Sequence, residues 1–234
     1  MKKCFIFAHY DKNNEIKSYI TDEINLLNEL GDVLFISDCE YLSNIKDLPK
    51  VKYLQISRHS LYDAHSYICG YNFLRFSKQL NYYDSITFVN SSIIFPTCDK
   101  ESFVNSLTKM DLEKESVYGM CKSRYLLQSY WITCKQKTYE YINMFFDNYI
   151  PATFEYVNEW WKENENKHKI LIRFKNSFEK RKIEVGEELA KKWMYTVVNF
   201  EHGFSIYLYR KGFTLIALDY CNWPKSRFIT KAPR

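Results

Sequence analysis

The stretch Cys4-Phe5-Ile6-Phe7-Ala8-His9-Tyr10-Asp11 decides the fold, because a short apolar run that stops at polar residues is typical of a buried strand entering a loop. The residues after it predict an amphipathic helix that ends at Gly31, since apolar side chains recur every three or four positions at Ile16, Ile20, Ile24, Leu27 and Leu30. Residues 33–37 form a second apolar run. A strand, a helix and a further strand in this order predict a parallel sheet covered by helices.

The same alternation continues along the first half of the chain. A helix is expected over residues 63–80, and further strands are expected over residues 52–57, 85–89, 117–121, 130–134 and 215–218. Residues 135–211 show mainly helical spacing, with an interruption near Asn199. We therefore expect an α/β fold in one domain over residues 1–234, with a mixed, mostly parallel sheet in residues 1–134 and a helix-rich part in residues 135–234 packed on one side of it.

Composition excludes several classes of protein. The 234 residues are 46% hydrophobic and 18% aromatic, which is enough for a sizeable core and excludes disorder. The six glycines form neither G-x-G-x-x-G nor G-x-x-x-x-G-K-[ST], which argues against a dinucleotide fingerprint and a P-loop. The net charge of +5 is mild, and the aromatic residues have core-type spacing, so no nucleic-acid partner is expected.

Cysteine usage and hydropathy indicate the compartment. The seven cysteines include no C-x-x-C pair, which favours free thiols in a reducing cytosol. The first apolar run ends at His9, so it is interpreted as a strand and not as a signal peptide. We expect a cytoplasmic protein that could work at the inner face of the plasma membrane. Phe154, Trp160 and Trp161 form an aromatic stripe near lysines, which fits either a core or a peripheral membrane contact.

Polar clusters follow three of the predicted strands. They are His9-Tyr10-Asp11, Ser57-Arg58-His59 and Asn90-Ser91-Ser92. Because ligands of such sheets bind beyond the carboxyl ends of the strands, the three clusters predict a nucleotide or sugar site on one rim. The alternative is that these residues only form turns and helix caps.

Five short motifs resemble a known family. Tyr62-Asp63-Ala64-His65-Ser66-Tyr67-Ile68-Cys69-Gly70 is similar to the Y-D-F-G-[AS]-Y-x-x-G segment of the bacterial rhamnan synthesis F family, which are glycosyltransferases of cell-surface polysaccharide assembly. The other four resemble, in the same order along the chain, its F-A-H-Y-D, N-D-S, W-G-M … L-Q-S-Y and Y-E-x-G-L-S … K-G-Y segments; they are Phe7–Asp11, Tyr83–Pro96, Tyr118–Tyr130 and Phe200–Phe213. The resemblance implies a GT-A-like fold in which residues 1–134 bind a nucleotide sugar and residues 135–234 form the acceptor side.

The sequence departs from the family at one position that concerns metal binding. The family's central Asp in N-D-S is Ser91 here, so Asn90-Ser91-Ser92 offers no carboxylate to the Mg²⁺ or Mn²⁺ that many GT-A enzymes hold beside the diphosphate. A reaction without metal is therefore favoured, and no cofactor and no metal ligand is predicted. Asp63 would be the ligand if a divalent cation were required.

The resemblance and the chemistry of the residues together suggest roles. Arg58 suits a diphosphate, although a surface salt bridge would also explain it. Asp63 would hold donor-sugar hydroxyls or cap the following helix, and Glu201 is the candidate catalytic base or a helix-start acid. The predicted catalytic residues are Glu201 and Asp63; the donor-binding residues are Ala8, His9, Tyr10, Arg58, His59, Asp63, Asn90, Ser91 and Ser92; the acceptor-binding residues are Gln128, Ser129 and His202.

The leading functional hypothesis is a glycosyltransferase. It would move a hexose, of rhamnose or galactose type, from a nucleoside-diphosphate donor to a bacterial surface polysaccharide or a lipid-linked glycan. The alternative is a non-catalytic nucleotide-sugar-binding protein of the same pathway, suggested by Ser91. An α/β enzyme with an S-adenosyl or other nucleotide ligand is a third reading, disfavoured by the lack of a glycine-rich loop.

Overall fold

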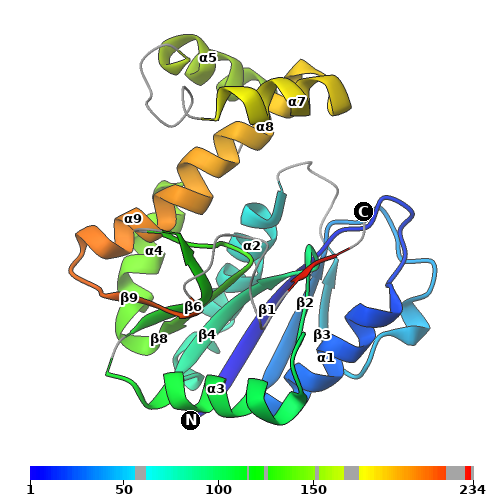
Figure 1. The fold of residues 1–234 in the computed structure, drawn as a ribbon, viewed down its shortest axis with the longest axis vertical. Coiled ribbons are helices and arrows are strands. Elements are labelled where there is room, and N and C mark those ends of the chain that lie inside the picture. Colours follow the sequence, from blue (N-terminus) through cyan, green and yellow to red (C-terminus); the bar gives the residue numbers. More distant parts are fainter. Residues whose placement is uncertain are drawn as a thin grey trace.

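A central sheet organises the computed structural model, which describes residues 1–55, 62–114, 116–123, 126–150, 153–165, 174–219 and 230–232 (Figure 1). The sheet has the order β3-β2-β1-β4-β8-β6-β7, and β9 pairs with β6. Its strands are β1 (Lys3–His9), β2 (Asp32–Ser37), β3 (Lys52–Gln55), β4 (Ser85–Asn90), β6 (Val117–Ser123), β7 (Leu126–Leu127), β8 (Trp131–Lys135) and β9 (Leu215–Asp219). A second, two-stranded sheet pairs β5 (Ile93–Ile94) with β10 (Thr230–Lys231).

The sheet is parallel around its centre and antiparallel on one side. β1 runs parallel to β2 and β4, and β2 runs parallel to β3. β8 lies antiparallel to β4 and β6, whereas β9 is parallel to β6. Residues 4–9 of β1 are all buried, as expected for a strand covered on both faces, and this explains its continuous apolar run. The predicted mixed, mostly parallel α/β sheet is confirmed.

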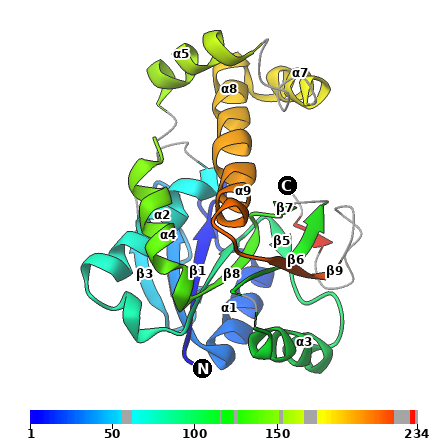
Figure 2. The same cartoon turned by 90° about the vertical axis from the view of Figure 1, so that its left-hand side faces the viewer.

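Helices cover both faces of the sheet and make three layers (Figures 1 and 2). One face packs against α1 (Ser18–Leu30) and α3 (Lys100–Leu112). The other packs against α2 (Tyr62–Phe76), α4 (Tyr139–Asn148) and α9 (Gly203–Arg210). Short 3₁₀ turns occur at η1 (Ile45–Asp47), η2 (Leu80–Tyr82) and η3 (Gln136–Thr138).

Three further helices form an arm that stands away from the sheet (Figure 1). The arm consists of α5 (Phe154–Asn164), α7 (Lys175–Val185) and α8 (Glu187–Thr196). Figure 2 shows α8 as a stalk that continues through the π-helical η4 (Val197–His202) into α9. The helices of residues 135–211 were expected on one side of the sheet; α4 and α9 lie there, but the arm extends beyond it.

The arm departs from that expectation because its aromatic residues pack on one another. Trp161 stacks on Phe178 with ring centroids 4.5 Å apart, and Trp160 meets Tyr195 edge-on at 5.2 Å. Trp160 and Trp161 thus pack against the small core of the arm and are partly buried, while Phe154 keeps 41% exposure beneath the ammonium of Lys192. Among the described helices, none has the length and apolar character needed to cross a bilayer. Contact with a membrane surface stays a prediction.

Candidate functional site

The carboxyl ends of β1 and β4 bring several predicted donor-binding residues together. Parallel pairing sets Ala8 opposite Asn90. The backbone N–H of Ser91 donates to the Ala8 carbonyl oxygen at 2.9 Å, and that of Tyr10 donates to Ser91 Oγ at 3.3 Å. Ala8, Tyr10, Asn90 and Ser91 therefore lie together at the predicted rim of the sheet. Arg58 and His59 lie outside the described residues.

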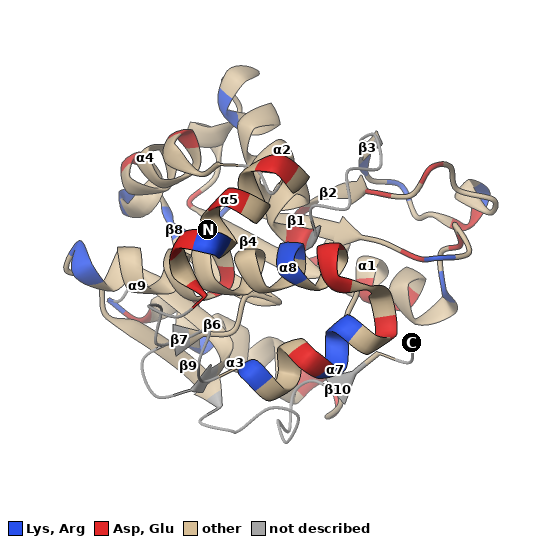
Figure 3. Ribbon diagram, turned by 90° about the horizontal axis from the view of Figure 1, so that it is seen from above, with Lys and Arg blue, Asp and Glu red and all other residues tan. Residues whose placement is uncertain are grey.

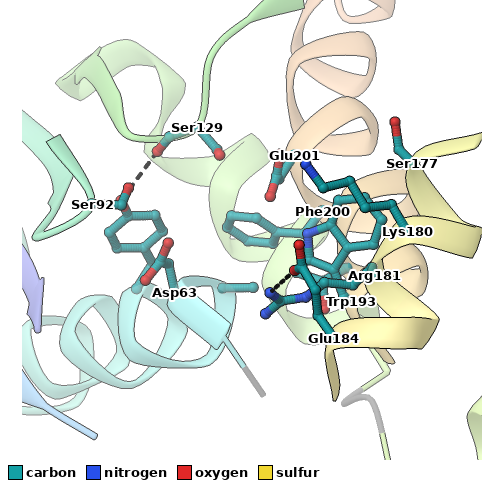
Figure 4. Close-up of a pocket in the computed structure, with 13 residues that line it drawn as sticks. Asp63, Ser92, Ser129, Ser177, Lys180, Arg181, Glu184, Trp193, Phe200 and Glu201 are labelled. Carbon is teal, nitrogen blue, oxygen red and sulfur yellow. Dashed lines mark hydrogen bonds and ion pairs between the residues drawn. The ribbon is translucent and has the colours of Figure 1, made fainter. Parts of the chain in front are cut away.

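A pocket of about 430 Å³ opens between this rim, α2 and the arm (Figure 4). Its volume falls in the range that holds small ligands. The wall on the side of the sheet consists of Asp63, Ala64, Tyr67, Ser92, Ser129, Phe200 and Glu201, and the wall on the side of the arm consists of Ser177, Lys180, Arg181, Glu184, Trp193 and Thr196.

Asp63 enters the pocket from the first turn of α2, where an acidic side chain is favoured by the helix dipole. Asn90 Nδ2, at the end of β4, donates to Asp63 Oδ2 at 2.5 Å, and this bond fixes the orientation of the carboxyl group. Burial raises the pKa of Asp63 to about 7, with a smaller contribution from the charge of Asp38. Asp63 is thus a carboxyl group that changes charge near neutral pH.

Glu201 reaches the same pocket from η4. The preceding residue, Phe200, is buried against Tyr67, with ring centroids 6.0 Å apart, and stacks on Phe204 at 5.8 Å. Because Phe200 fixes this turn in the core, Glu201 lies at the pocket wall (Figure 4). Burial, and then the negative charge of Asp63, raise the pKa of Glu201 to about 7.

The backbone at Glu201 differs from the expected break in the helix. Instead of an interruption near Asn199, the chain forms the π-helical turn η4 and continues into α9. Such wide turns occur frequently at functional sites. This turn brings Glu201 to the same pocket that Asp63 lines.

His9 lies beside the rim but does not line the pocket. Its side chain is 1% exposed and stacks on Phe35 at 5.1 Å, and Nδ1 lies 3.4 Å from Ser37 Oγ. Burial lowers the pKa of His9 to about 4, so the imidazole is neutral at pH 7. A role of His9 in donor binding stays a prediction.

Of the three predicted acceptor-binding residues, one lines the pocket and two do not. Ser129 lines the pocket, and its carbonyl oxygen accepts a hydrogen bond from Tyr67 Oη at 3.1 Å. Gln128 donates its backbone N–H to Cys121, and the ring of His202 meets Phe174 edge-on at 5.7 Å. Neither Gln128 nor His202 lines the pocket.

Sequence reasoning missed the wall formed by the arm. Ser177, Lys180 and Arg181 of α7 lie three and four residues apart, which places them on one face of the helix, and that face borders the pocket. The available signal was the cluster of basic residues in α7, but the sequence does not show that this helix borders the site. Within the described part of the chain, no three or more His, Cys, Asp or Glu side chains gather in a group that could hold a metal ion.

Comparisons with known proteins give structural matches only. No family model matches the sequence, and no curated protein matches it. The specific assignment to the rhamnan synthesis F family is therefore not confirmed.

Three solved structures match part of the chain. A provisionally assigned nucleotide-diphospho-sugar transferase from Desulfovibrio desulfuricans G20 is 11% identical with a TM-score of 0.40, over 64% of this chain and 69% of its own. A glycosyltransferase involved in glycosylation of the major capsid of PBCV-1 is 8% identical with a TM-score of 0.39, over 63% and 66%. A197 from STIV is 12% identical with a TM-score of 0.33, over 60% and 68%. At these values the matches carry no argument about function.

Proposed function

We propose that the protein is a glycosyltransferase that moves a hexose from a nucleoside-diphosphate sugar to a hydroxyl group of a glycan. One observation carries the proposal. Asp63 and Glu201, which are remote in sequence, line the same pocket, and the pKa of each is raised to about 7. A pair of carboxyl groups that titrate near neutral pH is typical of acid–base chemistry.

Glu201 is the proposed base. In transfer, the acceptor oxygen forms a bond to the anomeric carbon, and the bond from that carbon to the diphosphate oxygen breaks, with its electron pair leaving on the diphosphate. The acceptor hydroxyl must lose its proton, and the Glu201 carboxylate takes it. A carboxyl group with a pKa of about 7 is in part deprotonated at neutral pH and still holds a proton well, which suits a general base.

Asp63 is proposed to hold the donor sugar. The bond from Asn90 occupies Oδ2 and leaves Oδ1 to accept from sugar hydroxyls. Ser92 and Ser129 line the same wall and can exchange hydrogen bonds with hydroxyl groups. The pocket thus offers small polar side chains around two carboxyl groups, a combination that suits a sugar.

The finer assignments rest on the resemblance of the motifs. A hexose of rhamnose or galactose type, a bacterial surface polysaccharide or lipid-linked acceptor, and cytoplasmic work at the inner membrane face are proposed on that basis. A non-catalytic nucleotide-sugar-binding protein is the alternative, because Ser91 replaces the family's Asp.

The test measures nucleotide release from a panel of UDP-, dTDP- and GDP-hexoses with a glycan acceptor, for the wild type and Glu201→Gln. We expect glutamine to keep the shape of the side chain while removing its proton affinity, so turnover should fall by roughly 10²–10⁴-fold, with donor binding nearly unchanged. Glu179→Gln on α7 is the matched control, since Glu179 is exposed and outside the pocket. Donor binding without turnover in the wild type would support the non-catalytic alternative, and full activity of Glu201→Gln would end the role of Glu201.

A further inference from the structure

The two walls of the pocket differ in charge, since the sheet wall holds two acids whereas the arm wall holds two cations and one acid, Glu184. Asp63 and Glu201 stand on the wall of the sheet, whereas Lys180 and Arg181 stand on the wall of the arm (Figure 4). Seen from above the arm, basic and acidic positions alternate along α7 (Figure 3). The helix is therefore not uniformly basic, and Lys180 and Arg181 are the cations of α7 that border the pocket.

The residues at the end of β4 do not fit a divalent cation. Asn90 Oδ1 accepts from the Ser92 backbone N–H at 3.1 Å and from Ser92 Oγ at 2.5 Å, while Asn90 Nδ2 donates to Asp63. The amide oxygen of Asn90 thus already accepts two hydrogen bonds. Asp63 and Glu201, the two carboxylates of this wall, form no group of three metal-binding side chains with any other described residue. Mg²⁺ and Mn²⁺ beside a diphosphate prefer several oxygen ligands, including carboxylates.

Lys180 and Arg181 have N–H donors available to bind an anion. Lys180 is exposed and forms no ion pair with any described residue. The Arg181 guanidinium contacts Glu184 at 3.2 Å through Nη1, and its buried Nε has no hydrogen-bond partner among the described residues. A guanidinium carries five N–H donors, so one contact with Glu184 orients the group and leaves donors for an anion.

We propose that Lys180 and Arg181 of α7, with the hydroxyl of Ser177, bind the diphosphate of the donor in place of a metal ion. This inference rests on the proposed glycosyltransferase function and assigns its leaving-group site. When the bond between the anomeric carbon and the diphosphate oxygen breaks, the added negative charge stays on the diphosphate. Two cations at the opposite wall stabilise that charge in the way a metal ion would.

The experiment compares two double variants that remove the same charge from the same helix. Lys180→Gln/Arg181→Gln removes the cations at the pocket, and Lys175→Gln/Lys182→Gln removes two cations of α7 that do not line it. The affinity of each protein for UDP, dTDP and GDP and for the corresponding nucleosides is measured by calorimetry, with EDTA and with Mn²⁺. Melting temperatures show whether each variant is folded, and Lys180→Arg tests whether a cation at this position is sufficient.

We expect the best nucleoside diphosphate to bind the pocket variant about 10–100-fold more weakly, since the variant loses the charge-assisted hydrogen bonds of two cations, of which Lys180 is exposed to solvent. The affinity of the pocket variant for nucleosides should stay within about 2-fold of the wild type, because a nucleoside has no phosphate. The diphosphate affinity of the Lys175→Gln/Lys182→Gln control, of Lys180→Arg and of the wild type in EDTA should also stay within about 2-fold, because each keeps both cations at the pocket. Unchanged diphosphate affinity of the pocket variant would overturn this inference alone, as would a requirement for Mn²⁺. A wild type that binds none of the three diphosphates would overturn the proposed function together with it.

Discussion

The sheet layers and the arm differ in how much apolar surface they bury. Around the sheet, side chains as large as Trp131, Tyr67 and Phe88 are at most 1% exposed, and clusters cover both faces. In the arm, Phe178 keeps 8% exposure and the partly buried tryptophans include Trp161. Because local opening costs less where fewer apolar contacts are buried, we expect the sheet layers to be the stable unit and the arm to open first.

Because of this difference, the acids and the cations of the pocket are supported by parts of the protein that differ in stability. Asp63 is held by Asn90 of β4, and Glu201 follows Phe200, which is buried in the core of the sheet layers. Lys180 and Arg181 belong to α7, whose position depends on the smaller core of the arm. The acids are therefore fixed by the stable unit, while the cations are carried by the part that opens more easily.

Removing one large side chain from each region tests the comparison with the largest expected effect. Phe88 of β4 packs with ring centroids 5.3 Å from Tyr67 and 5.9 Å from Phe146. Phe88→Ala should lower the free energy of unfolding by about 3–5 kcal/mol, because it leaves a cavity in a closely packed core. Urea unfolding followed by fluorescence measures the loss.

Trp161→Ala is the counterpart in the arm. Trp161 is only partly buried, so truncation should cost about 1–2 kcal/mol, less than the full burial of an aromatic side chain contributes. It should also weaken the binding of a nucleoside diphosphate, because Lys180 and Arg181 lose part of the packing that supports α7, and it should lower the melting temperature only slightly. Equal losses of stability in the two variants would contradict the division into a stable sheet unit and a weaker arm.

A backbone substitution between α7 and α8 sharpens the comparison. Gly186 has φ 86° and ψ 163°, a conformation that is almost restricted to glycine, and an added Cβ would meet no atom within 4 Å. Gly186→Ala should therefore cost about 1–3 kcal/mol through backbone strain alone. Hydrogen exchange should become faster in α7 and α8 and stay unchanged in β1.

Gly212→Ala is the control on the side of the sheet. Gly212 has φ 90° and also has open space around it, but it lies in the turn from α9 to β9. Its strain should accelerate exchange in β9 and not in α7. Faster exchange of β1 amides in Gly186→Ala would show that the arm and the sheet unfold together.

Much of the fold could be predicted because the sheet is encoded locally. Residues 4–8 form an uninterrupted apolar run, and residues 85–89 are mainly apolar with Ile86, Phe88 and Val89, as is common in strands buried on both faces. The extension of the arm could not be predicted, since the stripe around Trp160 shows that α5 is buried on one side but not against which partner. That choice is made by tertiary packing on α7 and α8.

The candidate site was predicted only in part on its sheet side and missed on its arm side; Ala8, Tyr10, Asn90 and Ser91, also predicted for donor binding, do not line the pocket. Asp63, Ser92, Ser129 and Glu201 were identified from strand ends and motifs, and all four line the pocket. His9 was placed with them, but side chains of a strand alternate between faces. Ala8 belongs to the cluster under α2, whereas the His9 ring stacks on Phe35 in the layer under α1, away from the pocket.

The last prediction concerns the pH dependence of stability at the two acids. The pKa of Asp63 and that of Glu201 are about 7 in the folded protein, above their usual values of 3.8 and 4.5. Between these limits the folded state binds more protons than the unfolded state, so the free energy of unfolding falls as pH rises from about 4 to about 7. Below about pH 4 the two acids do not lower the free energy of unfolding, and above about pH 7 the loss of stability has reached its full size.

Glu201→Gln should remove the contribution of Glu201 and also the repulsion that it exerts on Asp63. We expect the variant to be more stable than the wild type by roughly 1–2 kcal/mol at pH 8, and to match it at pH 4.5, where the wild-type carboxyl groups are protonated in the folded state. Urea unfolding at the two pH values measures the difference, with Glu179→Gln as a control that should show no such change. If the variant gained the same stability at both pH values, the substitution would act through packing and not through charge. The carboxyl pair would then not be the feature that distinguishes the sheet wall of the pocket from the arm wall with its cations.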